Sequence, residues 1–191
     1  MIICIRKYKL GLVLFFMFMT LFILFNNGNI ISQSKNKYVG ANTCVGACHN
    51  TEAQGNQFNI WNESAHSRAF INLQTEKADS IARSKGFLTS ASETKECLKC
   101  HVLGKDIDES ELSGSFDKGQ GVQCESCHGP GSEYKKLSVM KDSGLAAANG
   151  LILHSEKQKF CIQCHNEESP TYFEFDYDQM WEMIAHPKPK Q

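Results

Sequence analysis

The chain has 191 residues, a formal net charge of −1 and nine cysteines, which is a high number for this length. Its length fits one domain or two small ones. Residues 1–34 hold three of the 20 basic residues and none of the 21 acidic ones, so the remainder carries a formal charge of −4. That balance excludes the basic surface that nucleic-acid binding requires.

The N-terminal segment predicts export. Three basic residues at positions 6, 7 and 9 precede an uncharged apolar run at residues 10–25. This run is short for a membrane span and long for the apolar part of a cleaved signal. We therefore expect residues 1–34 to be either a signal peptide or an N-terminal membrane anchor. Both place residues 35–191 outside the cytoplasm, because the basic flank stays inside.

The elements expected in the exported part are helices and loops. Residues 54–73 are the best helix candidate, since apolar side chains recur at steps of three and four, and residues 76–84 extend or follow this helix. Residues 104–121 predict an acidic surface loop. Further short helices are expected within residues 133–150 and over residues 177–185. The sequence therefore predicts a mainly α fold with long loops. Few aliphatic residues remain for a core, so we expect another group to fill it.

Four cysteine pairs, each followed at once by histidine, carry the chemistry. Three have the spacing Cys-x-x-Cys-His, at residues 97–101, 124–128 and 161–165, and a fourth at residues 44–49 has one additional residue between its cysteines. This spacing brings two thiols to one edge of a porphyrin and turns the following imidazole toward its iron, which is the signature of covalent haem attachment. The predicted cofactor is haem c, four groups per chain.

The predicted attachment residues are Cys44, Cys48, Cys97, Cys100, Cys124, Cys127, Cys161 and Cys164, and the predicted proximal iron ligands are His49, His101, His128 and His165.

Other uses of cysteine pairs fit less well. A disulfide framework, redox dithiols or zinc ribbons are alternatives for paired cysteines. None of them requires a histidine directly after every pair. For the longer motif at residues 44–49, a structural disulfide or a single thioether through Cys48 stays an alternative.

Three histidines lie outside the motifs and are the predicted distal iron ligands: His66, His154 and His186. His66 lies on the expected helix beside its apolar face, and His186 precedes Pro187. His154 borders a polar stretch, so a solvated side chain is the alternative there. Four irons and three imidazoles allow at most three bis-histidine haems. The methionines that offer substitute ligation are Met140, Met180 and Met183.

The chain resembles the cytochrome c-552/4 family of tetrahaem cytochromes, which includes the electron acceptor of hydroxylamine oxidoreductase. The resemblance rests on the lead-in Tyr38-Val-Gly, on Trp61 with Ser-Ala-His-Ser-Arg-Ala at residues 64–69, and on Cys-Glu-Ser-Cys-His-Gly-Pro-Gly at residues 124–131. It implies a mostly helical fold, haems in closely stacked pairs, three bis-histidine irons and one five-coordinate iron.

Two functions are compatible with this pattern. The first is electron transfer by a periplasmic or membrane-attached cytochrome whose partners are redox proteins, either membrane quinol-linked donors or soluble oxidoreductases. The second is an oxidoreductase acting on a small nitrogen species at a five-coordinate haem. Catalysis would want a base or cation beside the open iron, and the candidates Arg68, Lys99 and Tyr134 are ordinary in context. The sequence therefore favours the electron carrier.

Overall fold

A computed structural model describes residues 36–46, 49–102 and 107–187. These residues belong to the compact unit Lys35–Gln191. The predicted signal peptide or anchor and the predicted attachment residue Cys48 lie outside the described residues. In the described ranges no helix has the length and apolar character to cross a membrane.

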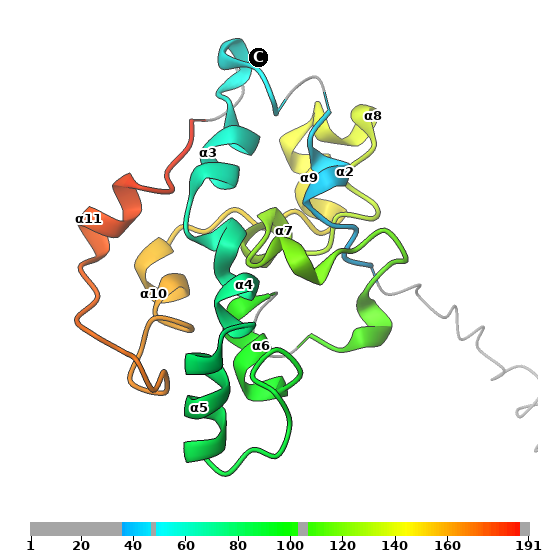
Figure 1. The fold of residues 1–191 in the computed structure, drawn as a ribbon. Coiled ribbons are helices and arrows are strands. Elements are labelled where there is room, and N and C mark those ends of the chain that lie inside the picture. Colours follow the sequence, from blue (N-terminus) through cyan, green and yellow to red (C-terminus); the bar gives the residue numbers. More distant parts are fainter. Residues whose placement is uncertain (1–35, 47–48, 103–106, 188–191) are drawn as a thin grey trace, which may run out of the picture. The chain divides into compact units, whose positions relative to one another are not determined.

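The described chain is mostly helical and has no strand, with a single bridge between Tyr38 and Leu112 (Figure 1). This confirms the predicted mainly α fold. The α-helices are α2 (Ala41–Cys44), α3 (Gln57–Glu63), α4 (Ala69–Leu73), α5 (Glu76–Ser84), α6 (Lys95–His101), α7 (Cys124–His128), α8 (Leu137–Met140), α9 (Ser143–Ala148), α10 (Lys157–Cys161) and α11 (Tyr177–Glu182). The 3₁₀ turns are η1 (Glu52–Gln54), η2 (His66–Arg68), η3 (Glu109–Glu111) and η4 (Lys118–Gln120).

The predicted continuous helix over residues 54–73 is wrong. The segment is divided into η1, α3, η2 and α4, and α3 ends where Ser64 adopts an extended conformation with ψ of 166°. The Ser64 hydroxyl donates to the Trp61 carbonyl at 2.6 Å, so a side chain competes with the helical hydrogen bonds. His66 consequently lies on a separate 3₁₀ turn after the break.

The other expected helices are present with shorter bounds in two cases. The predicted helix at residues 76–84 is confirmed as α5, and its first turn is capped by the Thr75 hydroxyl, which accepts from the Ala78 N–H. Residues 133–150 contain α8 and α9, and α11 ends at Glu182. The described part of the acidic stretch is not wholly a surface loop, because it contains η3 and η4 and its Glu111 is buried.

Side chains form only small apolar clusters. One surrounds Tyr38 and Val102, and the other surrounds Leu73, Ala82 and Ala91 on α4, α5 and the loop before α6. The described residues include ten buried apolar side chains, four of them alanines, against eleven large apolar side chains that are exposed. Such a core is small for this number of helices, as the sequence predicts for a fold built around another group.

Candidate functional site

Short helical turns present the cysteine–histidine motifs. α7 spans the whole motif Cys124–His128, and α6 ends on the motif histidine His101. In the motif at residues 161–165, the N–H of His165 donates to the carbonyl of Cys161 at 3.1 Å, which closes one further helical turn. One such turn brings residues three and four apart to the same side, so both cysteines and the histidine of a motif share one face. No disulfide joins the described cysteines, and in the described ranges no three His, Cys, Asp or Glu side chains form a ready metal site.

Cysteines from different motifs are neighbours. The Cys44 thiol lies close to Cys124, and this neighbour together with burial raises the pKa of Cys44. Cys164 likewise lies close to Cys100, and this neighbour together with burial raises the pKa of Cys164. The motif at residues 44–49 therefore lies beside the motif at residues 124–128, and the motif at residues 97–101 lies beside the motif at residues 161–165.

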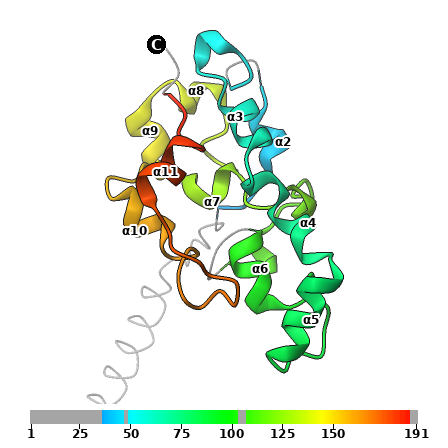
Figure 2. The same cartoon turned by 60° about the vertical axis from the view of Figure 1, so that its left-hand side comes forward.

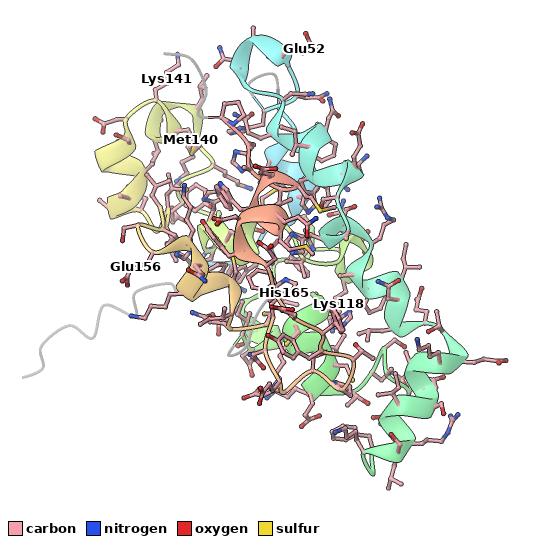
Figure 3. All side chains as sticks on the ribbon, turned by 90° about the vertical axis from the view of Figure 1, so that its left-hand side faces the viewer. Glu52, Lys118, Met140, Lys141, Glu156 and His165 are labelled. Atoms are coloured by element: carbon pink, nitrogen blue, oxygen red, sulfur yellow. The ribbon has the colours of Figure 1, made fainter. Side chains whose placement is uncertain are left out.

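The His165 cluster, defined as His66, His101 and His165, belongs to the second of these pairs. The ring centres of His66 and His165 are 6.1 Å apart, with an angle of 52° between the rings. Burial lowers the pKa of His165, and positive charge on His101 lowers it further. Phe175 stacks on His165 at 4.6 Å, and Figure 3 shows His165 toward the middle of the described chain.

The His128 cluster, defined as His49, His128, His154 and His186, belongs to the other pair of motifs. The ring centres of His128 and His186 are 5.9 Å apart, with an interplanar angle of 49°. Burial lowers the pKa of His128, and positive charge on His186, His154 and His49 lowers it further, against the opposing effect of its bond to the Ile152 carbonyl. The seven histidines thus divide into one cluster of three and one of four.

The spacing within both ring pairs fits a metal between them. A metal–imidazole bond is about 2.0 Å and the ring centre lies roughly 1.1 Å behind the ligating nitrogen, so two imidazoles on opposite sides of one iron have centres about 6 Å apart. Burial lowers the pKa values of His66, His128, His165 and His186. Low pKa values keep the imidazoles neutral, which is the form that binds metal.

Large apolar side chains next to the motifs are left uncovered. Ile162, inside the last motif, is 46% exposed, and Leu153, beside His154, is 57% exposed. Met183, just before His186, is 65% exposed. A flat apolar macrocycle would cover side chains of this kind, so the burial pattern and the histidine spacing both fit haem.

Hydrogen bonds fix the nitrogen that each ring turns away from a metal. Nδ1 of His101 lies 2.8 Å from the Ala69 carbonyl, and Nδ1 of His128 lies 3.0 Å from the Ile152 carbonyl. A bond of this kind leaves Nε2 available to bind a metal. In His154 the pattern is reversed, since Nε2 lies 2.6 Å from the Cys127 carbonyl while Phe160 packs on the ring.

The chain before α7 positions the His66 turn. The N–H of Val122 donates to the His66 carbonyl at 2.9 Å, and Nε1 of Trp61 donates to the Val122 carbonyl at 2.7 Å. Gly121, with φ of 66°, allows this approach, because a Cβ there would collide with the His66 carbonyl oxygen. His66 is thereby fixed to a segment that is distant in sequence.

The C-terminal segment that carries His186 is fixed from two sides. Nε2 of Gln57 donates to the Pro187 carbonyl at 2.9 Å. The Nζ of Lys157 lies 4.4 Å from the centre of the Trp181 ring, which joins α10 to α11, and these helices lie side by side in Figures 1 and 2. His186 is thus presented to its cluster by contacts from α3 and α10.

Two buried polar residues in and beside α7 were missed by the sequence reasoning. Gln123 and Glu125 are each 1% exposed, and both accept hydrogen bonds from backbone N–H groups of residues 39–41. Glu125 stands between the cysteines of its motif, where the side chain is unrestricted by haem attachment. A polar side chain at such a position is usually solvated, so no local pattern in the sequence indicates its burial.

The predicted substitute ligands lie at the surface in two cases. Met180 is 41% exposed and Met183 is 65% exposed. Met140 ends the short helix α8 (labelled in Figure 3). The paired imidazoles are therefore the better candidates for distal ligands.

Comparison with known proteins supports the same chemistry. The family model described as cytochrome c554 and c-prime matches residues 43–129, which include the first three motifs. Cytochrome c-554 of Nitrosomonas europaea is 30% identical in an alignment of 134 residues, which covers 62% of this chain and 54% of that protein. The chain thus spans about half the length of this relative. No solved structure matches the chain.

Proposed function

We propose that this chain, a c-type cytochrome related to the cytochrome c554 and c-prime family over residues 43–129, carries four haems and transfers electrons outside the cytoplasm. The observation that carries the proposal is the pair of imidazole couples, His66 with His165 and His128 with His186, at 6.1 and 5.9 Å. The residues proposed to hold the haems are the eight motif cysteines and the four motif histidines predicted from the sequence.

The two couples support an assignment of distal ligands. His66 serves the iron of His165, and His186 serves the iron of His128. His154 belongs to the cluster that contains His49, so we assign it to that iron. Its Nε2 is engaged with the Cys127 carbonyl, which leaves Nδ1 as the ligating nitrogen. The iron of His101 then has no histidine left and is the open one.

Haem, when bound, supplies a one-electron couple at its iron, at a potential set by its axial ligands, hydrogen bonds and burial. The chain contributes the ligand geometry. The Ala69 and Ile152 carbonyls hold His101 and His128 in one tautomer and orientation. Rigid ligands of this kind suit electron transfer, which requires little rearrangement between oxidation states.

The hydrogen bonds and ion pair of the three candidate catalytic side chains favour an electron carrier over an oxidoreductase. The Tyr134 hydroxyl donates to the Gly129 carbonyl at 2.7 Å, and Nη2 of Arg68 donates to the Glu63 carbonyl at 3.1 Å. Lys99 forms an ion pair with Glu168 at 2.9 Å. The three groups considered as distal acids or cations are therefore engaged elsewhere.

The location and partners follow from the proposal. Haem attachment to exported chains fits a periplasmic or membrane-attached protein that exchanges electrons with quinol-linked donors or soluble oxidoreductases. Fractionation of the native protein with N-terminal sequencing tests the location. A mature N-terminus near Lys35 would exclude an N-terminal anchor.

A haem count tests the function. The pyridine haemochrome assay with intact mass is expected to give four haems per chain, and carbon monoxide is expected to bind about one iron in four. Any other haem count would contradict the ligand assignment. Four low-spin irons inert to carbon monoxide would contradict the open iron, and turnover of nitric oxide, nitrite or hydroxylamine would favour the oxidoreductase.

A further inference from the structure

The Glu125 side chain fastens one attachment motif to the chain that leads into another. Its Oε1 accepts from the N–H of Val39 at 2.9 Å and from the N–H of Gly131 at 2.6 Å. Its Oε2 accepts from the N–H of Val39 at 2.9 Å and from the N–H of Gly40 at 2.7 Å. A single side chain thus binds three backbone N–H groups from two segments.

These contacts fit an ionised carboxylate. Both oxygens of Glu125 face N–H donors, and a protonated carboxyl would have to direct its O–H at one of them. Burial is the largest effect and raises the pKa of Glu125 above its usual range, while the three N–H groups and the nearby charge of Lys135 oppose this rise. The hydrogen bonds offset part of the desolvation cost and hold a negative charge in the interior.

The anchored segment leads directly to the first attachment cysteine. Ala41 begins α2, which ends at Cys44, and the N–H of Ala41 donates to Oε1 of Gln123 at 2.7 Å. Cys44 in turn lies close to Cys124, the residue between Gln123 and Glu125. The spacing between the first and third motifs is therefore set by these two buried side chains.

The close packing around the carboxylate leaves little freedom. A Cβ on Gly131 would lie 2.9 Å from Oε1 of Glu125 and 3.3 Å from Cγ2 of Val39. Gly131 thus allows its backbone to approach the carboxylate closely. The arrangement is built around the negative side chain.

We propose that Glu125 is a positioning residue for the haems of the first and third motifs, which fixes Cys44 against Cys124 and lowers the reduction potentials of those two haems. The inference rests on the proposed function, since it requires haem at both motifs. A buried negative charge stabilises the oxidised, more positive form of a nearby haem, and it acts strongly where water is excluded. The haems of the second and fourth motifs lie beside other groups and are expected to respond less.

The test compares Glu125→Gln with the wild-type holoprotein in a spectroscopic redox titration. Glutamine has the same shape, but it removes the charge and turns an NH₂ group toward an N–H donor. We expect two of the four haems to shift to higher potential, so that their oxidised-to-reduced ratio at a fixed poise falls several-fold. The electron paramagnetic resonance spectrum should also change, because the relative placement of the two haems changes. Glu125→Asp retains the charge and should return the potentials toward those of the wild type.

Glu168→Gln is the matched control, because it removes a carboxylate beside the other pair of motifs. The Glu168 side chain is 54% exposed and bonds Lys99, so solvent screens its charge and a small shift is expected. Wild-type potentials and an unchanged resonance spectrum in Glu125→Gln would overturn the inference. A shift spread equally over four haems would overturn it as well.

A maturation defect in Glu125→Gln gives a separate outcome. Mass spectrometry of haem peptides should then locate the missing haem at the first or third motif, and a loss at the second or fourth motif would overturn the inference. The wild-type peptides serve as the reference. Absence of haem from the first or third motif of the wild type would refute the proposed function itself. A wild type with haem at both motifs, together with a Glu125→Gln variant whose potentials and resonance spectrum are unchanged, would refute only the role of Glu125.

Discussion

The two histidine clusters are built by different means. Beside the His128 cluster, buried polar side chains join the first and third motifs, and the carboxylate of Glu125 accepts hydrogen bonds from three backbone N–H groups. Near the His165 cluster, α4, α5 and α6 pack through an apolar cluster centred on Leu73, Ala82 and Ala91. The half that contains the first and third motifs, the polar half, is thus held together by hydrogen bonding. The half that contains the second and fourth motifs, the apolar half, is held together by apolar packing.

This difference has a functional consequence in the proposed arrangement. Hydrogen bonds have strict geometry, so they suit a half in which both irons receive a second histidine. The apolar half contains one spare histidine, His66, for two irons. The polar half is therefore closed on both irons, and the apolar half keeps the open one.

Removal of a distal histidine should have the largest effect. His66→Ala is expected to raise carbon monoxide binding from about one to about two per chain, because the iron of His165 loses its sixth ligand. His186→Ala should give the same stoichiometry while opening an iron in the other half. Binding titrations and the high-spin resonance signal measure both. Asn72→Ala, at an exposed position on α4, is the control, and an unchanged stoichiometry in His66→Ala would contradict its pairing with His165.

Truncation in the apolar cluster should have the next largest effect. Leu73 is 5% exposed among the side chains of α4 and α5, so Leu73→Ala is expected to cost about 2–4 kcal/mol of unfolding free energy. Denaturant titration of the holoprotein measures this value. Leu88→Ala is the matched control, since Leu88 is fully exposed. Equal stability of the two variants would show that the apolar cluster contributes little to this half.

Alkaline pH should destabilise the protein through Tyr38, whose apolar cluster also includes Phe70 of α4 and Leu98 of α6. Burial raises the pKa of Tyr38 to about 12, with smaller effects of Glu111 and Glu125. The folded state therefore keeps the phenol proton above the pH at which the unfolded chain loses it. The stabilisation is complete below about pH 10 and is lost as the pH rises to about 12. Tyr38→Phe should show a shallower loss of stability over this window, and parallel curves for the two proteins would contradict the role of Tyr38.

The ion pair between α6 and the segment that follows the last motif should matter least. Lys99 and Glu168 are 2.9 Å apart, with side chains that are 25% and 54% exposed. Lys99→Ala is expected to cost about 0.5 kcal/mol or less, and the difference should vanish in high salt. Denaturant titrations at low and high ionic strength measure it. A larger, salt-independent loss would show that this contact holds the motifs of the apolar half together.

The cysteine–histidine motifs could be recognised in the sequence, whereas the long-range pairing of side chains could not. The cysteine–histidine motifs are contained in five or six residues, so their predicted role needs no tertiary information. His66 was predicted as a distal ligand, but nothing local relates it to His165. The two rings meet because Gly121 and Val122 hold the His66 turn, a contact that crosses a large part of the chain.

Two details show where local patterns mislead. The apolar periodicity of residues 54–73 predicted one helix, and a single hydroxyl at Ser64 interrupts it. Glu125 lies between two cysteines in an otherwise unremarkable position, and its burial depends on residues 39–41 folding over it. Apolar periodicity does not reveal which conformation a single side chain such as Ser64 adopts. It also does not reveal contacts with segments distant in sequence, on which the burial of Glu125 depends.

The alternating partnership of the motifs constrains the order of assembly. Cys44 meets Cys124, and Cys100 meets Cys164, so each partnership spans the motif that lies between its members in sequence. A chain that emerges from its N-terminus cannot complete one pair before it has begun the other. The first pair must wait for the third motif, and His186, the distal ligand that we propose for the iron of His128, comes later still in the chain. In the proposed arrangement the two halves are therefore completed in an overlapping order, and the half that contains the first and third motifs is complete only when the C-terminal segment docks.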